Sequence, residues 1–198
     1  LVQLFPKEIE SKTFAPNIKW EAPAVEVLDY PRLGWRGLMF DVARHFFTKE
    51  EVKHFIDDMV RYKYNILHLH LTDDEGWRLE IPGLPELTEV GARRGHNTSD
   101  ENFLHPSFGS GPDFNSSGTG YYTRQDFIDI LKYAKERHIR VVPEIETPGH
   151  ARAAIASMTA RYKRLMKEGK KLEAEQYLLI DLNDSSKYRS VQRWTNNV

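Results

Sequence analysis

The segment from His68 to Arg78 carries the densest set of reactive side chains in this sequence. It reads HLHLTDDEGWR and includes two histidines, three carboxylates, a tryptophan and an arginine. The segment ends an apolar run in which leucines alternate with other residues, as in a strand covered on at least one face. Polar groups at such a strand end are placed to bind or react with a ligand, so we expect the functional site there.

Polar clusters also follow two other apolar runs. They are Asp41 with Arg44, then Glu144 with Glu146, and His150 lies just beyond. A carboxylate such as Asp73, hydrogen-bonded to His150, would fix the imidazole tautomer for proton transfer. The forked donors of Arg44 could bind sugar hydroxyls or a carboxylate. Neighbouring carboxylates suggest glycoside hydrolysis, which normally uses a pair of them, but their spacing alone does not prove it.

Alternating strands and helices are predicted to position these clusters. Strands are predicted over residues 37–44, 65–73 and 139–146, where apolar runs end in polar residues. Helices are predicted after Thr48 and after Thr123, because a carboxylate three residues later completes a capping-box pattern in each case. An alanine-rich stretch, residues 151–158, predicts a third helix.

This order of elements predicts an α/β fold. Strand–helix–strand units pair their strands in parallel, with right-handed crossovers. Both a (β/α) barrel and a doubly wound sheet place their sites at the carboxyl ends of such strands. A complete barrel needs roughly 250 residues, so 198 residues with three convincing strands fit only part of one. Residues 1–33 hold four prolines without sustained periodicity and are expected to be a linker or the edge of a preceding domain.

The composition argues against several classes of partner. With 28 basic and 29 acidic residues and a net charge of -1, the chain lacks the basic excess that binds nucleic acids or anionic membranes. It has no cysteine for a disulfide, a thiolate nucleophile or a zinc knuckle. No apolar stretch approaches the roughly 20 residues of a membrane span. No signal peptide is evident, which leaves export open; a secreted, periplasmic or lysosome-like location is expected.

Three ordered motifs together resemble a known family. They read RGLMFDVARHF over residues 36–46, HLHLTDDEGWR over 68–78 and VPEIETPGH over 142–150. Through them, residues 34–158 resemble the β-N-acetylhexosaminidases of glycoside hydrolase family 20. The resemblance implies a (β/α)8 TIM barrel, of which residues 34–198 would supply roughly the first three to four β/α units.

The resemblance also implies an activity. Enzymes of this family remove terminal N-acetylglucosamine or N-acetylgalactosamine from glycans or glycoconjugates in an exo-acting manner, without a cofactor. Their mechanism is retaining and substrate-assisted, because the substrate's own 2-acetamido oxygen attacks the anomeric carbon. The family's catalytic Asp-Glu pair follows the fourth strand and is expected beyond Val198. The chain alone is therefore expected to be inactive, with the remainder of the barrel supplied by further sequence or a partner segment.

Four site residues follow from the resemblance, position by position. Arg44 matches the arginine that grips the outer hydroxyls of the sugar. Asp73 and His150 match the carboxylate and imidazole that support the acid–base glutamate. Glu146 stands where the family usually has aspartate, and it is expected to bind substrate. The resemblance implies no metal site.

Two rival functions and one geometric question accompany this interpretation. The chain could be a non-catalytic carbohydrate-binding fragment, or a metal-dependent barrel hydrolase that uses His68, His70 and Asp73. Packed residues supporting the site are the more ordinary role for the two histidines. Trp77 could cap the cleft wall or stack on a sugar. Strict alternation would place Asp73 on the leucine face of its strand, so a break or bulge near Thr72 is predicted.

Overall fold

The computed structural model describes residues 2–96, 102–108, 110, 113, 115–147 and 149–179. The last residues of the predicted 34–198 domain, 180–198, lie outside the described residues, as does Pro148 of the third motif. The chain divides into two units, Leu1–Gly34 and Trp35–Val198, and each is described by itself.

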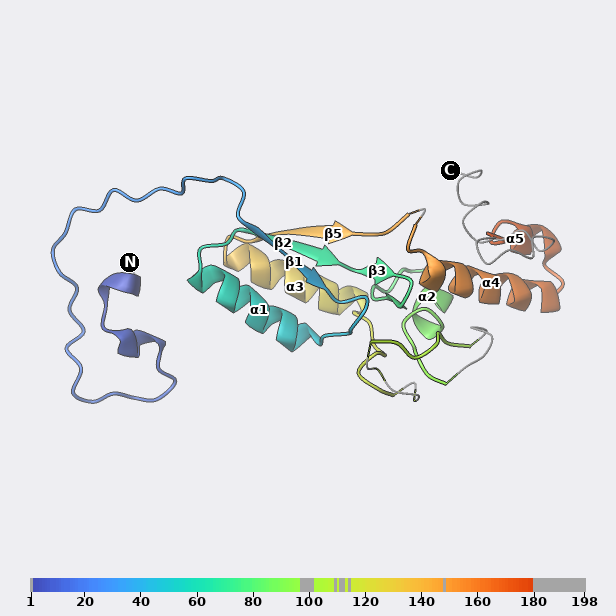
Figure 1. The fold of residues 1–198 in the computed structure, drawn as a ribbon, viewed down its shortest axis with the longest axis horizontal. Helices are drawn as coiled ribbons and strands as arrows, with labels where there is room; N and C mark the ends of the chain where they lie inside the picture. Colours follow the sequence, from blue (N-terminus) through green and yellow to red (C-terminus); the bar gives the residue numbers. More distant parts are fainter. Residues whose placement is uncertain are drawn as a thin grey trace. The chain divides into compact units, whose positions relative to one another are not determined.

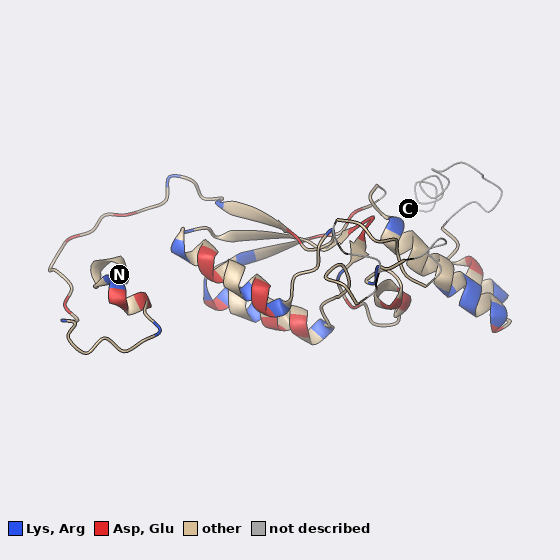
Figure 2. Ribbon diagram, turned by 60° about the horizontal axis from the view of Figure 1, so that its bottom comes forward, with Lys and Arg blue, Asp and Glu red and all other residues tan. Residues whose placement is uncertain are grey.

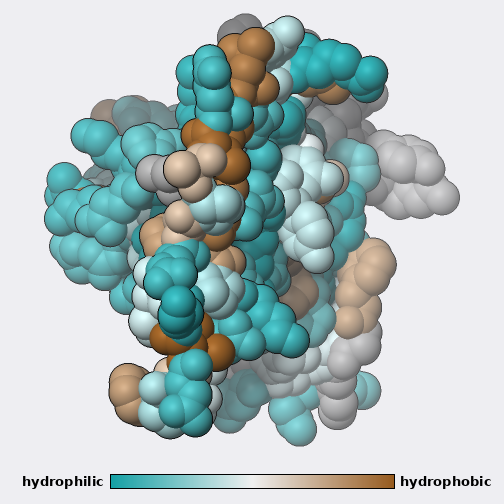
Figure 3. Space-filling model, turned by 90° about the vertical axis from the view of Figure 1, so that its left-hand side faces the viewer, coloured by the Kyte–Doolittle hydropathy of each residue, from teal (hydrophilic) through white to brown (hydrophobic). Residues whose placement is uncertain are grey.

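The first unit contains little regular structure. It has two short 3-10 helices, Val2–Leu4 and Lys7–Glu10. Several of its large apolar side chains are exposed, with Phe14 and Leu28 each at 89%. Brown hydrophobic residues accordingly lie among teal hydrophilic ones on the surface drawn in Figure 3. None of the described residues of this unit belongs to the buried core.

The second unit is built on three parallel strands. They are β1 (Gly37–Asp41), β2 (Ile66–His70) and β5 (Arg140–Glu144), in the order β1-β2-β5. Helices α1 (Lys49–Arg61) and α3 (Arg124–Glu136) connect successive strands and lie along one face of the sheet (Figure 1). The predicted α/β class and its parallel strand–helix units are confirmed.

Both helices begin where the sequence predicts, because their first turns are capped as expected. The Thr48 side chain accepts from the Glu51 amide while the Glu51 carboxylate accepts from the Thr48 amide, and Thr123 and Asp126 form the same reciprocal pair. This capping satisfies amides that the helix itself leaves unpaired. Charged residues of both signs are interleaved along α1 and α3, whereas the strands are mainly uncharged (Figure 2).

The main core lies between the sheet and these two helices. Its buried residues come from α1, β2, α3 and the positions next to the strands: Val42, Val52, Ile56, Met59, Leu67, Leu69, Leu71, Ile130, Ala134 and Ile139 among them. Leu38 and Phe40 of β1 and Val141 of β5 are partly buried and pack against this core. Leu67 and Leu69 of β2 belong to this core. Because side chains alternate along a strand, His68 and His70 face the other side of the sheet.

The chain between β2 and α3 departs from regular layering. A two-stranded hairpin, β3 (Thr72–Asp73) with β4 (Gly76–Trp77), directly follows β2, and a short helix α2 (Glu86–Glu89) comes next. After β5 come α4 (Arg152–Lys167), which extends well beyond the predicted 151–158, and α5 (Lys171–Glu175). No helix in the described part of the chain has both the length and the apolar character to cross a membrane.

Candidate active site

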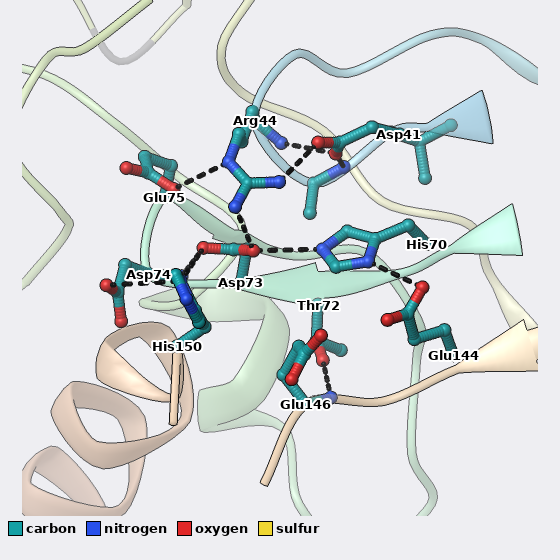
Figure 4. Close-up of polar contacts among 12 residues, drawn as sticks. Asp41, Arg44, His70, Thr72, Asp73, Asp74, Glu75, Glu144, Glu146 and His150 are labelled. Atoms are coloured by element: carbon teal, nitrogen blue, oxygen red, sulfur yellow. Dashed lines mark hydrogen bonds and ion pairs between the residues drawn. The ribbon is translucent and has the colours of Figure 1, made fainter. Parts of the chain in front are cut away.

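The carboxyl ends of the three parallel strands bring the predicted clusters together (Figure 4). Asp41, His70 and Glu144 form one row across the sheet, since Asp41 is in register with His70 and His70 with Glu144. Strand β1 ends at Asp41, three residues earlier than predicted. The Asp41 carboxylate accepts from the amides of Ala43 and Arg44 at 3.0 and 3.1 Å, and this turn terminates the strand.

The predicted break after the second strand is confirmed. Strand β2 ends at His70, and Thr72–Asp73 pairs in antiparallel fashion with Gly76–Trp77 instead of continuing the sheet. The change of direction moves Asp73 to the histidine side of the sheet. His70 Nε2 and Asp73 Oδ2 therefore lie 2.9 Å apart, although regular alternation would have separated them.

Asp73 is the centre of the site. It is only 2% exposed, and four nitrogen atoms lie against its carboxylate. Oδ2 faces Arg44 Nη2 at 2.7 Å and His70 Nε2 at 2.9 Å, while Oδ1 faces the Asp74 amide at 2.7 Å and His150 Nδ1 at 3.2 Å. Burial alone would raise the pKa of Asp73, but the Asp74 amide, His70 and Arg44 together hold it below its ordinary value. Asp73 is thus an anion at neutral pH.

Arg44 is held between carboxylates at the mouth of the site. Its Nη1 donates to Asp41 at 2.6 Å and its Nη2 lies 2.7 Å from Asp73, with Glu75 at 3.9 Å from Nε. The hydrogen bond to Asp41 is the largest cause of a raised pKa for Arg44. The side chain remains 34% exposed. Two short contacts use two of its five N–H donors, so others can reach a ligand.

A second arginine, Arg78, is buried behind the Arg44 turn. All its N–H groups donate to backbone carbonyls: Nε to Val42, Nη2 to Ala43 and Gly118, and Nη1 to Ala92 and Gly120, at 2.7–3.2 Å. Burial lowers the pKa of Arg78 to about 9, so it stays charged at neutral pH. Sequence reasoning missed this role. The sequence signal that could have indicated it is Gly76, because a glycine in a strand often marks a close approach of another backbone. In the structure a Cβ at this position would lie 2.6 Å from the Ala43 carbonyl oxygen.

His150 enters the site from the turn before α4. Its Nδ1 faces Asp73 at 3.2 Å, and its φ of 51° places it in the left-handed region, which is uncommon for residues other than glycine. The Asp74 carboxylate accepts from the amide of Arg152, the first residue of α4, at 2.9 Å. This contact caps α4 and ties the start of the helix, and with it His150, to the Asp73 turn.

Glu144 and Glu146 place two neighbouring carboxyl groups beside His70. Glu144 Oε2 lies 2.6 Å from His68 Nε2 and 2.8 Å from His70 Nδ1. Burial raises the pKa of Glu144, yet hydrogen bonds from His70 and Glu146 lower it overall; the pKa of Glu146 is raised by its hydrogen bond to Glu144. When this pair holds a proton, Glu146 is the favoured site. The backbone amide of Glu146 donates to Thr72 Oγ1 at 2.9 Å.

The structure thus places Arg44, Asp73, His150 and Glu146 at one end of the sheet, as the sequence predicts. Two other expectations change. Trp77 is 9% exposed and packs in a second hydrophobic cluster, with Nε1 donating to the Leu79 carbonyl at 2.6 Å, so it has no free face for a sugar.

The set His68, His70 and Asp73, predicted as a rival metal site, is not assembled. Among the described residues, the groups with donor atoms close enough for one ion are His70, Glu144 and Glu146, and Asp73, Asp74 and His150. Both ring nitrogens of His70 already face carboxylates.

Comparison with known families agrees with the geometry. Residues 33–196 match the glycosyl hydrolase family 20 catalytic domain. The chain belongs to this family. The resemblance inferred from the three motifs is confirmed, and the structural relatives place the parallel strands in a TIM-barrel catalytic domain.

Relatives of known name include two Vibrio proteins. The chain is 55% identical over 170 residues to N,N′-diacetylchitobiase of Vibrio harveyi, an alignment covering 86% of this chain and 19% of that protein. It is 50% identical over 173 residues to a β-hexosaminidase of Vibrio vulnificus, covering 87% and 20%. The chain therefore spans about a fifth of the length of these curated relatives.

Solved structures give the same family. A family 20 exo-β-N-acetylglucosaminidase from Vibrio harveyi, in complex with N-acetylglucosamine, has a TM-score of 0.65 and 40% identity over 83% of this chain and 22% of its own. An N-acetyl-β-hexosaminidase from Streptomyces plicatus has a TM-score of 0.64 and 40% identity over 79% and 28%.

Proposed function

We propose that this chain is part of a longer exo-acting β-N-acetylhexosaminidase that hydrolyses terminal N-acetylglucosamine or N-acetylgalactosamine from glycans or glycoconjugates. Residues 34–198 would supply the first three to four units of its TIM barrel, and residues 1–33 a linker or the edge of a preceding domain. The observation that carries the proposal is the network around Asp73, in which Arg44 and His150 meet one buried carboxylate.

The proposed mechanism is retaining and substrate-assisted. The acetamido oxygen of the substrate attacks the anomeric carbon while an acid glutamate protonates the leaving oxygen, and the same glutamate then activates water. The Asp-Glu pair for these steps would come from beyond this chain. The described residues would supply the sugar clamp and the support behind the glutamate, without a cofactor.

Arg44 is suited to the clamp because its position is fixed on two sides. Asp41 and Asp73 hold its guanidinium at 2.6 and 2.7 Å, and a third of the side chain remains exposed. A pre-oriented guanidinium loses little conformational freedom when it binds sugar hydroxyls. Glu146, whose amide donates to Thr72 at the same end of the sheet, is proposed to add a further contact to the substrate.

Asp73 and His150 are suited to proton transfer. Because an anionic Asp73 faces Nδ1 of His150, a neutral His150 ring carries its proton on Nδ1. The lone pair on Nε2 is then available to the glutamate. Positive charge that develops on the ring during proton transfer is stabilised by the buried carboxylate. Such a support acts through the glutamate and affects the chemical step more than binding.

The test is release of chromophore from aryl N-acetyl-β-glucosaminide and N-acetyl-β-galactosaminide by the complete enzyme and by the 198-residue chain. We expect turnover by the complete enzyme and none by the chain alone. Asp73→Asn should lower kcat by about 100-fold or more, within the range of general acid–base support. An inactive complete enzyme that still binds the sugar would favour the carbohydrate-binding alternative and refute the proposed hydrolase.

A further inference from the structure

His70 lies between two carboxylates in the middle of the site. Its Nε2 is 2.9 Å from Asp73 Oδ2 and its Nδ1 is 2.8 Å from Glu144 Oε2. The residue is 4% exposed and belongs to β2, so its ring has little freedom to move. Figure 4 shows the ring lying between these two carboxyl groups.

The partners of the ring decide its protonation state. The Nε2 contact with Asp73 is a hydrogen bond, whereas Nδ1 approaches Glu144 Oε2 without hydrogen-bond geometry, a contact that becomes an ion pair when the ring is protonated. The pKa values of Asp73 and Glu144 both lie below their ordinary values, which favours the carboxylate form of each. Although burial opposes the charge, the contacts with Glu144 and Asp73 raise the pKa of His70 overall. The two facing carboxylates therefore favour the imidazolium form of His70.

The charge of His70 matters because acidic groups outnumber permanent cations around it. Asp41 lies in the same row on β1, and Asp73, Asp74 and Glu75 follow β2. The titratable and charged groups at this end of the sheet include Asp41, Arg44, His68, Asp73, Asp74, Glu75, Glu144, Glu146 and His150, and two buried arginines, Arg78 and Arg94, interact with Asp41 and Glu75. Arg44 is a permanent cation in direct contact with Asp73.

We propose that His70 is a positioning residue for hydrolysis: as a buried imidazolium it keeps Asp73 ionised and turns its Oδ1 toward His150. This inference rests on the proposed function. In it, His70 and Glu144 support Asp73 and His150, which in turn support the acid glutamate. His70 acts through Asp73 and touches no substrate.

The sign of the effect follows from the contacts. Without His70, Asp73 loses a charged hydrogen bond, so its pKa rises and it takes up a proton at higher pH. A protonated Asp73 no longer accepts a hydrogen bond from His150, so the ring loses its orientation and kcat/KM falls. The acid limb of the pH profile of kcat/KM should therefore move to higher pH. One neighbouring opposite charge shifts a carboxylate pKa by roughly 1–3 units.

Two amide variants separate the contacts of His70. In His70→Asn the amide nitrogen replaces Nδ1, which keeps the contact with Glu144 and removes that with Asp73. In His70→Gln it replaces Nε2, which keeps a donor to Asp73 and removes the charge. We expect the acid limb of the complete enzyme to move up by about one pH unit in the Asn variant and about half as far in the Gln variant.

His68 provides the matched control. It faces the same side of β2 and contacts Glu144 at 2.6 Å, while Asp73 contacts His70. The profile of His68→Asn should retain the parent's acid limb. An unshifted limb in His70→Asn, or a loss of activity of equal size at every pH, would overturn the proposal.

The protonation state can be tested without kinetics. Neutron diffraction from crystals of the complete enzyme near pH 7 should show deuterium on both ring nitrogens of His70. A ring with deuterium on one nitrogen alone would refute the inference, even if His70→Asn fails to fold. An inactive parent enzyme with a doubly protonated His70 would instead count against the proposed hydrolase.

Discussion

Replacing Arg78 should test how the turn that carries Arg44 is held. Arg78→Met keeps an apolar stem of similar length and removes every donor to the five carbonyls. The Ala92 carbonyl also accepts a hydrogen bond from the Gly120 amide, so the replacement leaves the other four carbonyls without the partner that Arg78 supplies. Each buried group that loses its partner costs about 1–3 kcal/mol.

The expected loss is smaller than that sum, because the variant no longer buries an unpaired guanidinium. We expect the free energy of unfolding to fall by about 3–5 kcal/mol. Arg78→Lys, which keeps the charge and three of five donors, should lose roughly half as much. Because Val42 and Ala43 directly precede Arg44, KM for the aryl glycoside should rise in both variants.

The assay is urea unfolding of the complete enzyme, followed by fluorescence, with KM measured in parallel. Arg124→Met, at an exposed position of α3, is the control and should change the free energy by no more than about 0.5 kcal/mol. A loss below about 1 kcal/mol for Arg78→Met would show that these carbonyls are satisfied without the guanidinium and would refute the reasoning.

Three smaller changes test the supports of the fold. Asp74→Ala should lower kcat with little change in KM and cost about 1 kcal/mol of stability, because the Arg152 amide loses its cap and His150 its anchor; a fully active variant would contradict this. Thr48→Ala should cost about 1 kcal/mol in thermal unfolding, whereas Thr48→Ser should cost less. Burial raises the pKa of Glu86, but its own backbone amide and two arginines of α4 lower it overall, so its stabilisation is present at neutral pH and lost as the pH falls. The difference in urea midpoint between the parent and Glu86→Gln should therefore shrink from pH 7 to about pH 3, and a constant difference would refute the assignment.

The sequence by itself determined the class of fold and the family. Apolar runs of strand length and capping residues such as Thr48 and Thr123 are local signals, and the structure follows them within a few residues at most boundaries. Residue types at the strand ends located the site because parallel strands share one carboxyl edge. The motifs then identified family 20, since three ordered matches specify more than composition can.

The tertiary structure decided how the site residues meet. Regular alternation separates Asp73 from His70, and only the hairpin after β2 brings their atoms to 2.9 Å. The donors of Arg78 reach carbonyls as far along the chain as Ala43 and Gly118, contacts that no local pattern encodes. The charge of His70 likewise depends on carboxylates from two other segments. Protonation and orientation depend on neighbours in space, and those neighbours exist only in the folded chain.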